Sequence, residues 1–265
     1  MLKKTLPYLL SVLVLASVAQ SRRRNFRQRE IGFLAGASYY IGDINPRLHF
    51  VGSKPAGGVF FRYTTNYRYA FRFGFNYGSL AASDSKSKEP DQLERNLSFK
   101  TQLYELNTIA EFNFVEYRIG HDKYRFTMFV FAGLAGFYFN PQADAGNGYQ
   151  SLRNYKTEGE SKPYSRFQVS IPFGLGFKWN LGKRCGLGCE WGPRRTFTDY
   201  LDDIKGAYPA VSKTTSNPFT SRSRDGVTDP GSMRGNPSTR DWYFYYGFTL
   251  SIKLTDPHKQ CFKDF

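Results

Sequence analysis

Residues 167–179, FQVSIPFGLGFKW, decide the fold class of this chain. Every second residue from Phe167 to Trp179 is large and apolar, whereas the residues between them are glycine, proline, polar or charged. A repeat of two residues is the repeat of a β-strand, in which successive side chains point to opposite faces. The stretch therefore predicts a strand with one apolar face and one face that carries glycine and Lys178.

Seven further stretches alternate in a similar way, the second and fifth less regularly. The predicted strands lie at residues 31–39, 59–64, 71–78, 104–114, 124–139, 167–179, 185–192 and 242–254. An apolar outer face and an inner face of glycine, polar and charged residues are typical of a barrel in lipid. An eight-stranded barrel has room inside only for side chains, which suits glycine on the inner face. We predict an all-β fold, a membrane-spanning antiparallel up-and-down β-barrel of about eight strands.

The connections between the predicted strands alternate between short and long. Short turns are expected near residues 66, 120 and 182, and long connections at about 42–56, 80–96, 140–164 and 199–239. Outer-membrane barrels have short periplasmic turns and long outer loops, whereas a soluble β-sandwich, the alternative fold, does not need the alternation. The pattern predicts an outer-membrane, multi-pass barrel with both termini in the periplasm.

The N-terminal residues are typical of a secretory signal peptide. Lys3 and Lys4 precede an apolar run, and small residues before position 20 indicate cleavage after Ala19. The predicted organisation is a signal peptide (1–19), a basic periplasmic arm (20–29), an outer-membrane barrel with long extracellular loops (30–254) and a periplasmic C-terminal tail (255–265). The formal net charge is +15. Export argues against nucleic acid as a partner and favours anionic outer-membrane lipid or acidic proteins.

The arm before the first predicted strand is strongly basic. Its arginines are Arg22, Arg23, Arg24, Arg27 and Arg29. Two interpretations stay open, a solvated tail that meets anionic lipid and a docking segment for a periplasmic partner. A run of basic residues does not separate them.

Charged residues on the predicted inner face indicate a salt-bridged plug rather than an open pore. The carboxylates are Glu105, Glu111 and Glu190, and the cations are Arg72, Arg125, Lys178, Arg194 and Lys253. We expect the core of this network to be Glu190, Arg194, Glu111, Glu105 and Arg72. Because a buried unpaired charge is costly, the two signs should pair across the barrel.

The predicted topology brings together no arrangement typical of catalysis. His49 is placed in an outer loop, whereas His121 and His258 are placed on the periplasmic side. Glu105 and Glu111 lie about 20 Å apart along one strand, too far for paired carboxylate chemistry. We predict that the protein is not an enzyme and has no catalytic residues, no metal, no cofactor and no small-molecule substrate.

Two further groups of residues bear on metal binding and on disulfides. Asp199, Asp202 and Asp203 lack the spacing of a calcium loop. Cys185 and Cys189 would lie about 13 Å apart on a strand, too far for a disulfide, and a pairing of Cys185 with Cys261 stays open.

One block of sequence resembles a known family. Residues 190–203, EWGPRRTFTDYLDD, are similar to the signature of PorG-type proteins, small outer-membrane barrels associated with the type IX secretion system of Bacteroidetes. Residues 30–45 and 172–178 are similar as well, although Pro193 departs from the larger residue of the pattern. The resemblance covers nearly the whole mature chain. It implies a non-enzymatic subunit that contacts the periplasmic ring of the PorK lipoprotein and PorN.

Two other functions compete with this one. An autonomous small barrel would act as an adhesin or a membrane stabiliser through its outer loops. A barrel enzyme acting on lipid would need a Ser–His pair at one membrane face, and His49 is the only outer candidate. The first two functions differ in the side of the membrane that carries the contacts.

Overall fold

Eight long β-strands dominate the computed structural model, which describes residues 27–146, 148–209, 217–226 and 230–254. These strands are β1 (Gln28–Ile41), β2 (Lys54–Thr64), β3 (Tyr69–Ser83), β4 (Ser98–Asn113), β5 (Phe126–Phe139), β8 (Phe167–Asn180), β9 (Cys185–Thr196) and β10 (Trp242–Lys253). The predicted signal peptide (1–19), Arg22, Arg23 and Arg24 of the arm, and the tail 255–265 with Cys261 lie outside the described residues.

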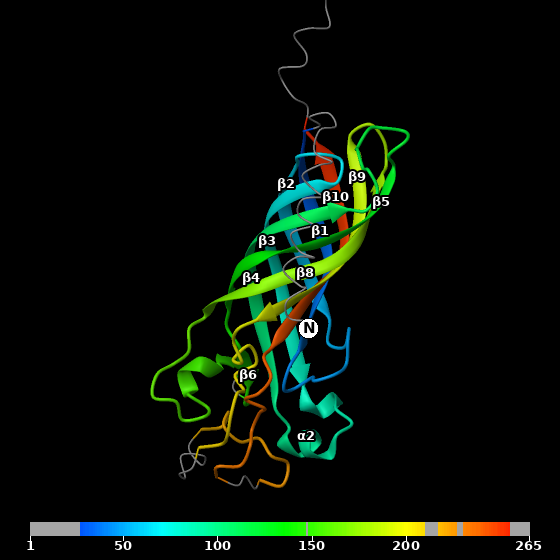
Figure 1. Cartoon of the computed structure of the whole chain (residues 1–265). Coiled ribbons are helices and arrows are strands. Elements are labelled where there is room, and N and C mark those ends of the chain that lie inside the picture. The colour runs from blue at the N-terminus through cyan, green and yellow to red at the C-terminus, as the bar shows by residue number, and fades with distance from the viewer. Residues whose placement is uncertain (1–26, 147, 210–216, 227–229, 255–265) are drawn as a thin grey trace, which may run out of the picture.

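The eight strands close into one antiparallel barrel (Figure 1). Each strand pairs with the next one in chain order, and β1 pairs with β10 from Glu30–Lys253 to Ile41–Trp242 to complete the cylinder. Every predicted strand has its counterpart, so the prediction of an all-β, up-and-down barrel of eight strands is confirmed. Among the residues that the structure describes, no helix is both long and apolar enough to cross a bilayer.

The first four strands, β1 to β4, begin earlier than predicted, and β1 and β2 show why. β1 starts at Gln28, which pairs with Thr64 and donates a hydrogen bond from its buried side chain to Glu30. The expected boundary between arm (20–29) and barrel (30–254) is therefore wrong by two residues, and Arg29 belongs to the strand. β2 starts at Lys54, because residues 54–58 pair through their backbone with β1 although they show no alternation of side chains.

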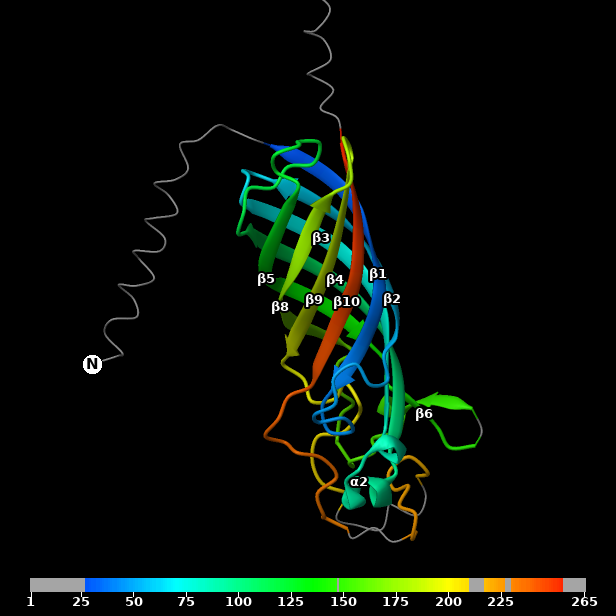
Figure 2. The same cartoon turned by 90° about the vertical axis from the view of Figure 1, so that its right-hand side faces the viewer.

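Turns gather at one end of the barrel and loops at the other (Figure 2). The turns span residues 65–68, 114–125 and 181–184, and we call this end the turn end. The loops span 42–53, 84–97, 140–166 and 197–241, at what we call the loop end. They contain η2 (Asp84–Lys86), α2 (Pro90–Arg95), β6 (Gln142–Asp144), β7 (Tyr149–Ser151) and η3 (Leu152–Tyr155). The alternation of short and long connections is as predicted except at 114–125, which is as long as the loop 42–53.

The outer wall of the barrel is apolar over most of its height. Large apolar side chains stand exposed on seven of the eight strands, among them Phe33, Val59, Phe73, Leu106, Leu134, Val169 and Phe248, and on β9 Leu187 and Trp191 are half-buried. Soluble proteins rarely expose an apolar surface of this extent, whereas a barrel in lipid requires it.

The inner face differs most from the prediction on β5. β5 points Phe129, Phe131 and Phe137 inward, where the sequence pattern led us to expect glycine and polar residues. These rings fit because glycines oppose them. A Cβ atom added at Gly176 would lie 2.6 Å from the Phe129 ring, and one at Gly174 would lie 2.7 Å from Phe131. The inward glycines therefore provide the space that the aromatic rings fill.

Candidate functional site

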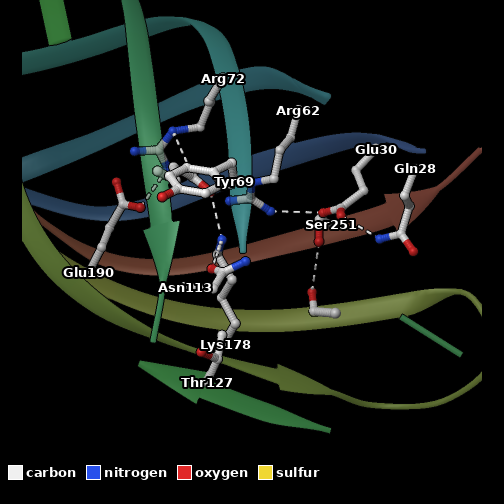
Figure 3. Close-up of polar contacts among 12 residues, drawn as sticks. Gln28, Glu30, Arg62, Tyr69, Arg72, Asn113, Thr127, Lys178, Glu190 and Ser251 are labelled. Atoms are coloured by element: carbon white, nitrogen blue, oxygen red, sulfur yellow. Dashed lines mark hydrogen bonds and ion pairs between the residues drawn. The ribbon is translucent and has the colours of Figure 1, made fainter. Parts of the chain in front are cut away.

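A chain of ion pairs crosses the turn-end half of the barrel interior. Arg62 on β2 lies 2.8 Å from Glu30 on β1 and 2.9 Å from Glu111 on β4. Arg72 on β3 contacts the other oxygen of Glu111 at 3.2 Å and reaches Glu190 on β9 at 2.6 Å. Figure 3 shows the Arg62–Glu30 and Arg72–Glu190 contacts. These contacts link the four neighbouring strands β1 to β4 with β9 on the opposite side of the barrel.

Lys178 and Glu111 form the point at which this chain branches. The Lys178 ammonium on β8 donates to Glu111 at 2.6 Å and to the Asn113 side-chain oxygen at 2.9 Å. Glu111 thus faces three cations, and its side chain has no exposed surface. A carboxylate removed from water in this way is stable only because its oxygens are paired.

A second cluster lies nearer the loop end, around Glu105. Its carboxylate accepts hydrogen bonds from Asn76 at 2.8 Å, Asn107 at 2.9 Å and the Tyr243 hydroxyl at 2.8 Å. The Arg194 guanidinium lies 3.4 Å away. Glu105 therefore has partners from β3, β4, β9 and β10.

Charges of the two signs balance within the described strands. The buried charged side chains are Glu30, Glu105, Glu111, Glu190, Arg62, Arg72, Lys178 and Arg194, four anions and four cations. Each cation also lies over an inward aromatic ring, at 4.7 Å for Arg62 over Phe60 and 4.3 Å for Lys178 over Phe129. We call these eight residues the interior ion network. It fills the barrel with paired charge and rings.

All five interior residues selected from the sequence, Arg72, Glu105, Glu111, Glu190 and Arg194, lie in this network. Their pairing could not be read from strand faces alone. Glu190 pairs with Arg72. Arg194, four residues further along the same strand, pairs with Glu105.

Sequence reasoning missed Glu30 and Arg62, although both continue the inward face of their strands. Conversely, Arg125 is not an interior residue. It lies exposed at the turn end and pairs with Asp122 at 2.5 Å.

The long loops fold together over the loop end as a cap with its own core. Buried apolar residues from the loop-end parts of the strands and from all four loops form one cluster, including Ile44, Leu97, Phe99, Ala143, Leu152, Leu201, Ile204 and Phe219.

Two arginines connect the loops of the cap through hydrogen bonds. Arg95 makes two 2.8 Å contacts to Asp84 and donates to the Asp43 and Arg234 carbonyls at 3.0 and 2.6 Å. Arg234, 3% exposed, donates to the Asp203 carbonyl at 2.6 Å and to Thr157 at 3.0 Å.

Tyr40 joins the cap to the barrel. Its hydroxyl lies 2.6 Å from an oxygen of Asp202 and 2.9 Å from an oxygen of Asp241. A tyrosine hydroxyl has one proton to donate. Both contacts can be hydrogen bonds only if one carboxyl carries a proton and donates it to the Tyr40 oxygen. Burial raises the pKa of both Asp202 and Asp241 well above the usual range, which agrees with a shared proton.

Asp203 shows the same effect of burial within the cap. Its carboxyl accepts hydrogen bonds from Thr157 at 2.5 Å and from Tyr164 at 2.6 Å. Burial raises the pKa of Asp203 to about 6, although Arg234 and these two hydroxyls act in the opposite direction. The backbone of Asp203 is left-handed, with φ of 68°.

The sequence block 190–203 therefore runs from the interior ion network into the cap. Glu190 and Arg194 belong to the network, whereas Leu201, Asp202 and Asp203 are buried in the cap. The hydrogen bonds of these aspartates go to hydroxyls and backbone amides of the chain itself. Within the described part of the chain, no group of three or more His, Cys, Asp or Glu residues is arranged to hold a metal ion.

The histidines that the structure describes lie at opposite ends of the barrel. His49, in the loop 42–53, contacts the Tyr39 hydroxyl at 3.1 Å. His121, in the turn 114–125, accepts a hydrogen bond from the Lys123 backbone at 3.2 Å. These two residues cannot share one site.

Of the arginines expected to bind a partner, the structure describes Arg27 and Arg29. Both are exposed at the turn end. The turns there are basic as well, with the cations Arg68, Arg118, Lys123, Arg125, Lys183 and Arg184 and the acids Glu116 and Asp122. The basic character that we noted in the arm therefore extends over the turn end.

Comparison with known proteins gives a family and several barrels of related shape. Residues 3–264 match the family described as "Domain of unknown function (DUF6089)". No curated protein matches the chain. Similar solved structures include the N-terminal β-barrel domain of Pseudomonas aeruginosa OprF, with 10% identity over 86% of this chain and 100% of that chain and a TM-score of 0.38.

Two further structures have similar values. The outer membrane protein OprG from Pseudomonas aeruginosa is 11% identical over 87% of this chain and 95% of that chain, with a TM-score of 0.39. Ail of Yersinia pestis, in complex with the heparin analogue sucrose octasulfate, is 9% identical over 86% of this chain and 97% of that chain, with a TM-score of 0.38. The strand pairing described above establishes the fold independently of these similarities.

Proposed function

We propose that this chain, which belongs to the DUF6089 family, is an outer-membrane β-barrel that acts through its surfaces and has no catalytic role. Strands of 11 to 16 residues are long enough to cross a bilayer, since a tilted transmembrane strand needs about 9–11 residues. The closed barrel leaves no strand edge unpaired, which is the condition for β-structure in lipid. The exposed apolar wall then faces the lipid.

One observation supports a role through the protein's surfaces: side chains fill the interior of the barrel, and the cap covers its loop end. The interior ion network and its aromatic rings occupy the interior, and the cap closes over the loop end. An eight-stranded barrel has an interior that side chains fill, so it does not conduct a folded or extended protein. Any contribution to transport must therefore come from contacts at the wall, the turn end or the cap.

The more specific proposal is that the protein is a subunit of the type IX secretion machinery that contacts the periplasmic ring of PorK and PorN. The resemblance of residues 190–203 to the PorG-type signature supports this assignment. The exposed basic residues of the turn end support a contact on the periplasmic side, since charge complementarity speeds encounter with an acidic partner. A stable contact buries roughly 800 Å² per partner, more than the three turns alone usually offer, so the arm is expected to take part.

Co-purification tests this proposal. The variant with Arg22, Arg23, Arg24 and Arg27 replaced by serine leaves Gln28 and β1 intact. We expect the folded barrel in the membrane at normal levels, with reduced recovery of the PorK–PorN ring and impaired export of type IX cargo. A matched variant replaces four exposed cations of the loop end, Lys156, Lys162, Arg224 and Arg240, by serine and should recover the ring normally.

The outcomes separate the competing functions. Equal recovery of the ring by both variants would move the contact from the arm to the turns or the wall. Normal cargo export after deletion of the whole gene would contradict the secretion role. It would favour the autonomous barrel, an adhesin or membrane stabiliser, which the internally bonded cap supports as a rigid outer surface.

A further inference from the structure

A cavity of about 730 Å³ opens at the side of the loop end. Its walls come from the loop 42–53, the last residues of β3, the segment 86–92 and the first residues of β4. Three buried members of the cap core, Ile44, Phe99 and Ala143, also line it. The volume lies in the range of about 300–1,000 Å³ that is typical of ligand sites.

The polar rim of this cavity is strongly basic. Arg47, Lys54, Lys86, Lys88 and Lys100 line it, whereas Glu89 is its one acidic residue. None of the five cations forms an ion pair with a carboxylate among the residues that the structure describes. The cations of the interior ion network, in contrast, are all paired. The cavity therefore offers an excess of positive charge to an anion from outside the chain.

The position of the cavity on the outer wall indicates where that anion comes from. Tyr77 on β3 and Tyr104 on β4 face each other across the strands, with ring centroids 5.3 Å apart, and both are exposed. Tyrosines in such a position mark the boundary between lipid tails and headgroups. Ala81 and Lys100 pair four residues further toward the loop end, about 10 Å higher for a tilted strand. The cavity thus begins at the level of lipid headgroups.

Resting on the outer-membrane location proposed above, we propose that this cavity binds the phosphate-bearing headgroup of a lipid in the outer leaflet. The lysines of the rim contact the phosphate, and the acyl chains follow the wall past Tyr77 and Tyr104. The apolar residues Leu48 and Val51, 45% and 41% exposed at the rim, contact the glycerol or sugar part. An apolar cavity that continues into the apolar wall suits an amphiphile better than an acidic peptide, which has no apolar tail to place there.

Native mass spectrometry of the full chain in neutral detergent micelles tests the proposal. The probes are dioleoyl phosphatidic acid, dioleoyl phosphatidylcholine and glycerol 3-phosphate. We expect retention of phosphatidic acid at least tenfold above phosphatidylcholine, and glycerol 3-phosphate to bind at least tenfold more weakly than phosphatidic acid. Equal binding of glycerol 3-phosphate and phosphatidic acid would show a site for soluble phosphate and overturn the lipid assignment.

Two variants locate the binding. Lys54→Gln combined with Lys86→Gln and Lys88→Gln removes charge, and Ala81→Trp fills the cavity while keeping every cation. Each should lower retention of phosphatidic acid at least tenfold. The control Lys162→Gln/Arg224→Gln removes exposed charge outside the cavity and should stay within twofold of the parent.

Unchanged retention in both cavity variants would refute the site. Circular dichroism and heat-modifiable migration establish that each variant is folded. Because neither PorK nor PorN is present in this assay, failure of lipid binding leaves the ring contact untouched, and failure of ring recovery leaves the lipid site untouched.

Discussion

Glu111 is the residue on which the interior ion network depends most. Its carboxylate lies 2.6 Å from Lys178, 2.9 Å from Arg62 and 3.2 Å from Arg72, and no part of its side chain is exposed. Glu111→Gln keeps the size of the side chain but removes the charge. Four buried cations then face three carboxylates within the described strands, and one positive charge has no counterpart.

Removing one partner of a buried ion pair costs about 3–5 kcal/mol, because the remaining charge stays out of water. We therefore expect Glu111→Gln to lower the free energy of unfolding by about that amount. The pair Arg125–Asp122 provides a matched control, since its side chains are 65% and 95% exposed. Exposed pairs contribute about 0–1 kcal/mol, so Arg125→Gln should change stability by no more than this.

Urea unfolding of the barrel in phosphatidylcholine vesicles, followed by tryptophan fluorescence, measures both variants. The double variant Glu111→Gln/Lys178→Gln leaves three cations with three carboxylates inside. Residues in direct contact show coupling of about 0.5–3 kcal/mol, and we expect the double variant to regain stability within that range relative to the sum of the single changes. If Glu111→Gln is as stable as Arg125→Gln, the interior ion network does not have the energetic role assigned to it.

Three further predictions concern the cap, the packing of the interior and the topology. The pKa of Asp203 rises to about 6 on folding, so this carboxyl binds its proton more tightly in the native state than in the unfolded chain. The stabilisation from this proton is therefore complete at low pH. It declines by up to about 3 kcal/mol as the pH rises from about 4 to above 6. Asp203→Asn, which suits the left-handed backbone, should remove this dependence in hydrogen exchange of the cap, and a pH profile equal to that of the parent would contradict it. A Cβ at Gly32 would lie 2.2 Å from the Phe60 ring, so Gly32→Ala should lower the free energy of unfolding in urea by about 1–3 kcal/mol. Adding Phe60→Leu to the same chain should recover part of that loss. A Gly32→Ala variant as stable as the parent would argue against this packing. An epitope inserted at Gly226 should react with antibody on intact cells and one at Gly182 only after the outer membrane is opened, whereas the reverse pattern would invert the orientation.

The strand faces could be predicted because lipid and interior impose opposite chemistry on alternate residues. This rule alone is enough to predict that Glu105 and Glu111 point into the barrel, as they do. It fails where the alternation stops. The first half of β2, residues 54–58, carries no such signal, and the pattern does not single out Arg62 at the far end of that strand.

Most of the pairings inside the barrel could not be predicted, because four of the six ion pairs depend on the stagger between strands that are not neighbours. Alternation shows that Glu190 faces inward but not that Arg72, on the far side of the barrel, lies at the same height. The same limit applies to the cap. The contact between Arg95 and the Arg234 carbonyl joins residues 139 positions apart, and no local periodicity encodes it.

Tyr40 illustrates a third limit. Tyr39 and Tyr40 are adjacent aromatic residues at the end of a strand, where a position at the lipid boundary is expected. Tyr40 is nevertheless 1% exposed, and the loop 42–53 covers Tyr39 through His49 and Phe50. A single sequence does not show which exposed face a long loop will cover.

The seam between β1 and β10 also bears on how the barrel forms and how long it lasts. Its register pairs Glu30 with Lys253, positions more than 200 residues apart, whereas every other seam joins strands that follow one another in the chain. Bringing the ends of a chain of that length together costs about 5 kcal/mol of loop entropy, so closure is expected to be the last and slowest step of folding. Tyr40 and Asp241 bond across this seam at the loop end and form only once it has closed. Interactions absent from the transition state act on the rate of unfolding, so this pair should extend the lifetime of the closed barrel and leave its rate of assembly unchanged.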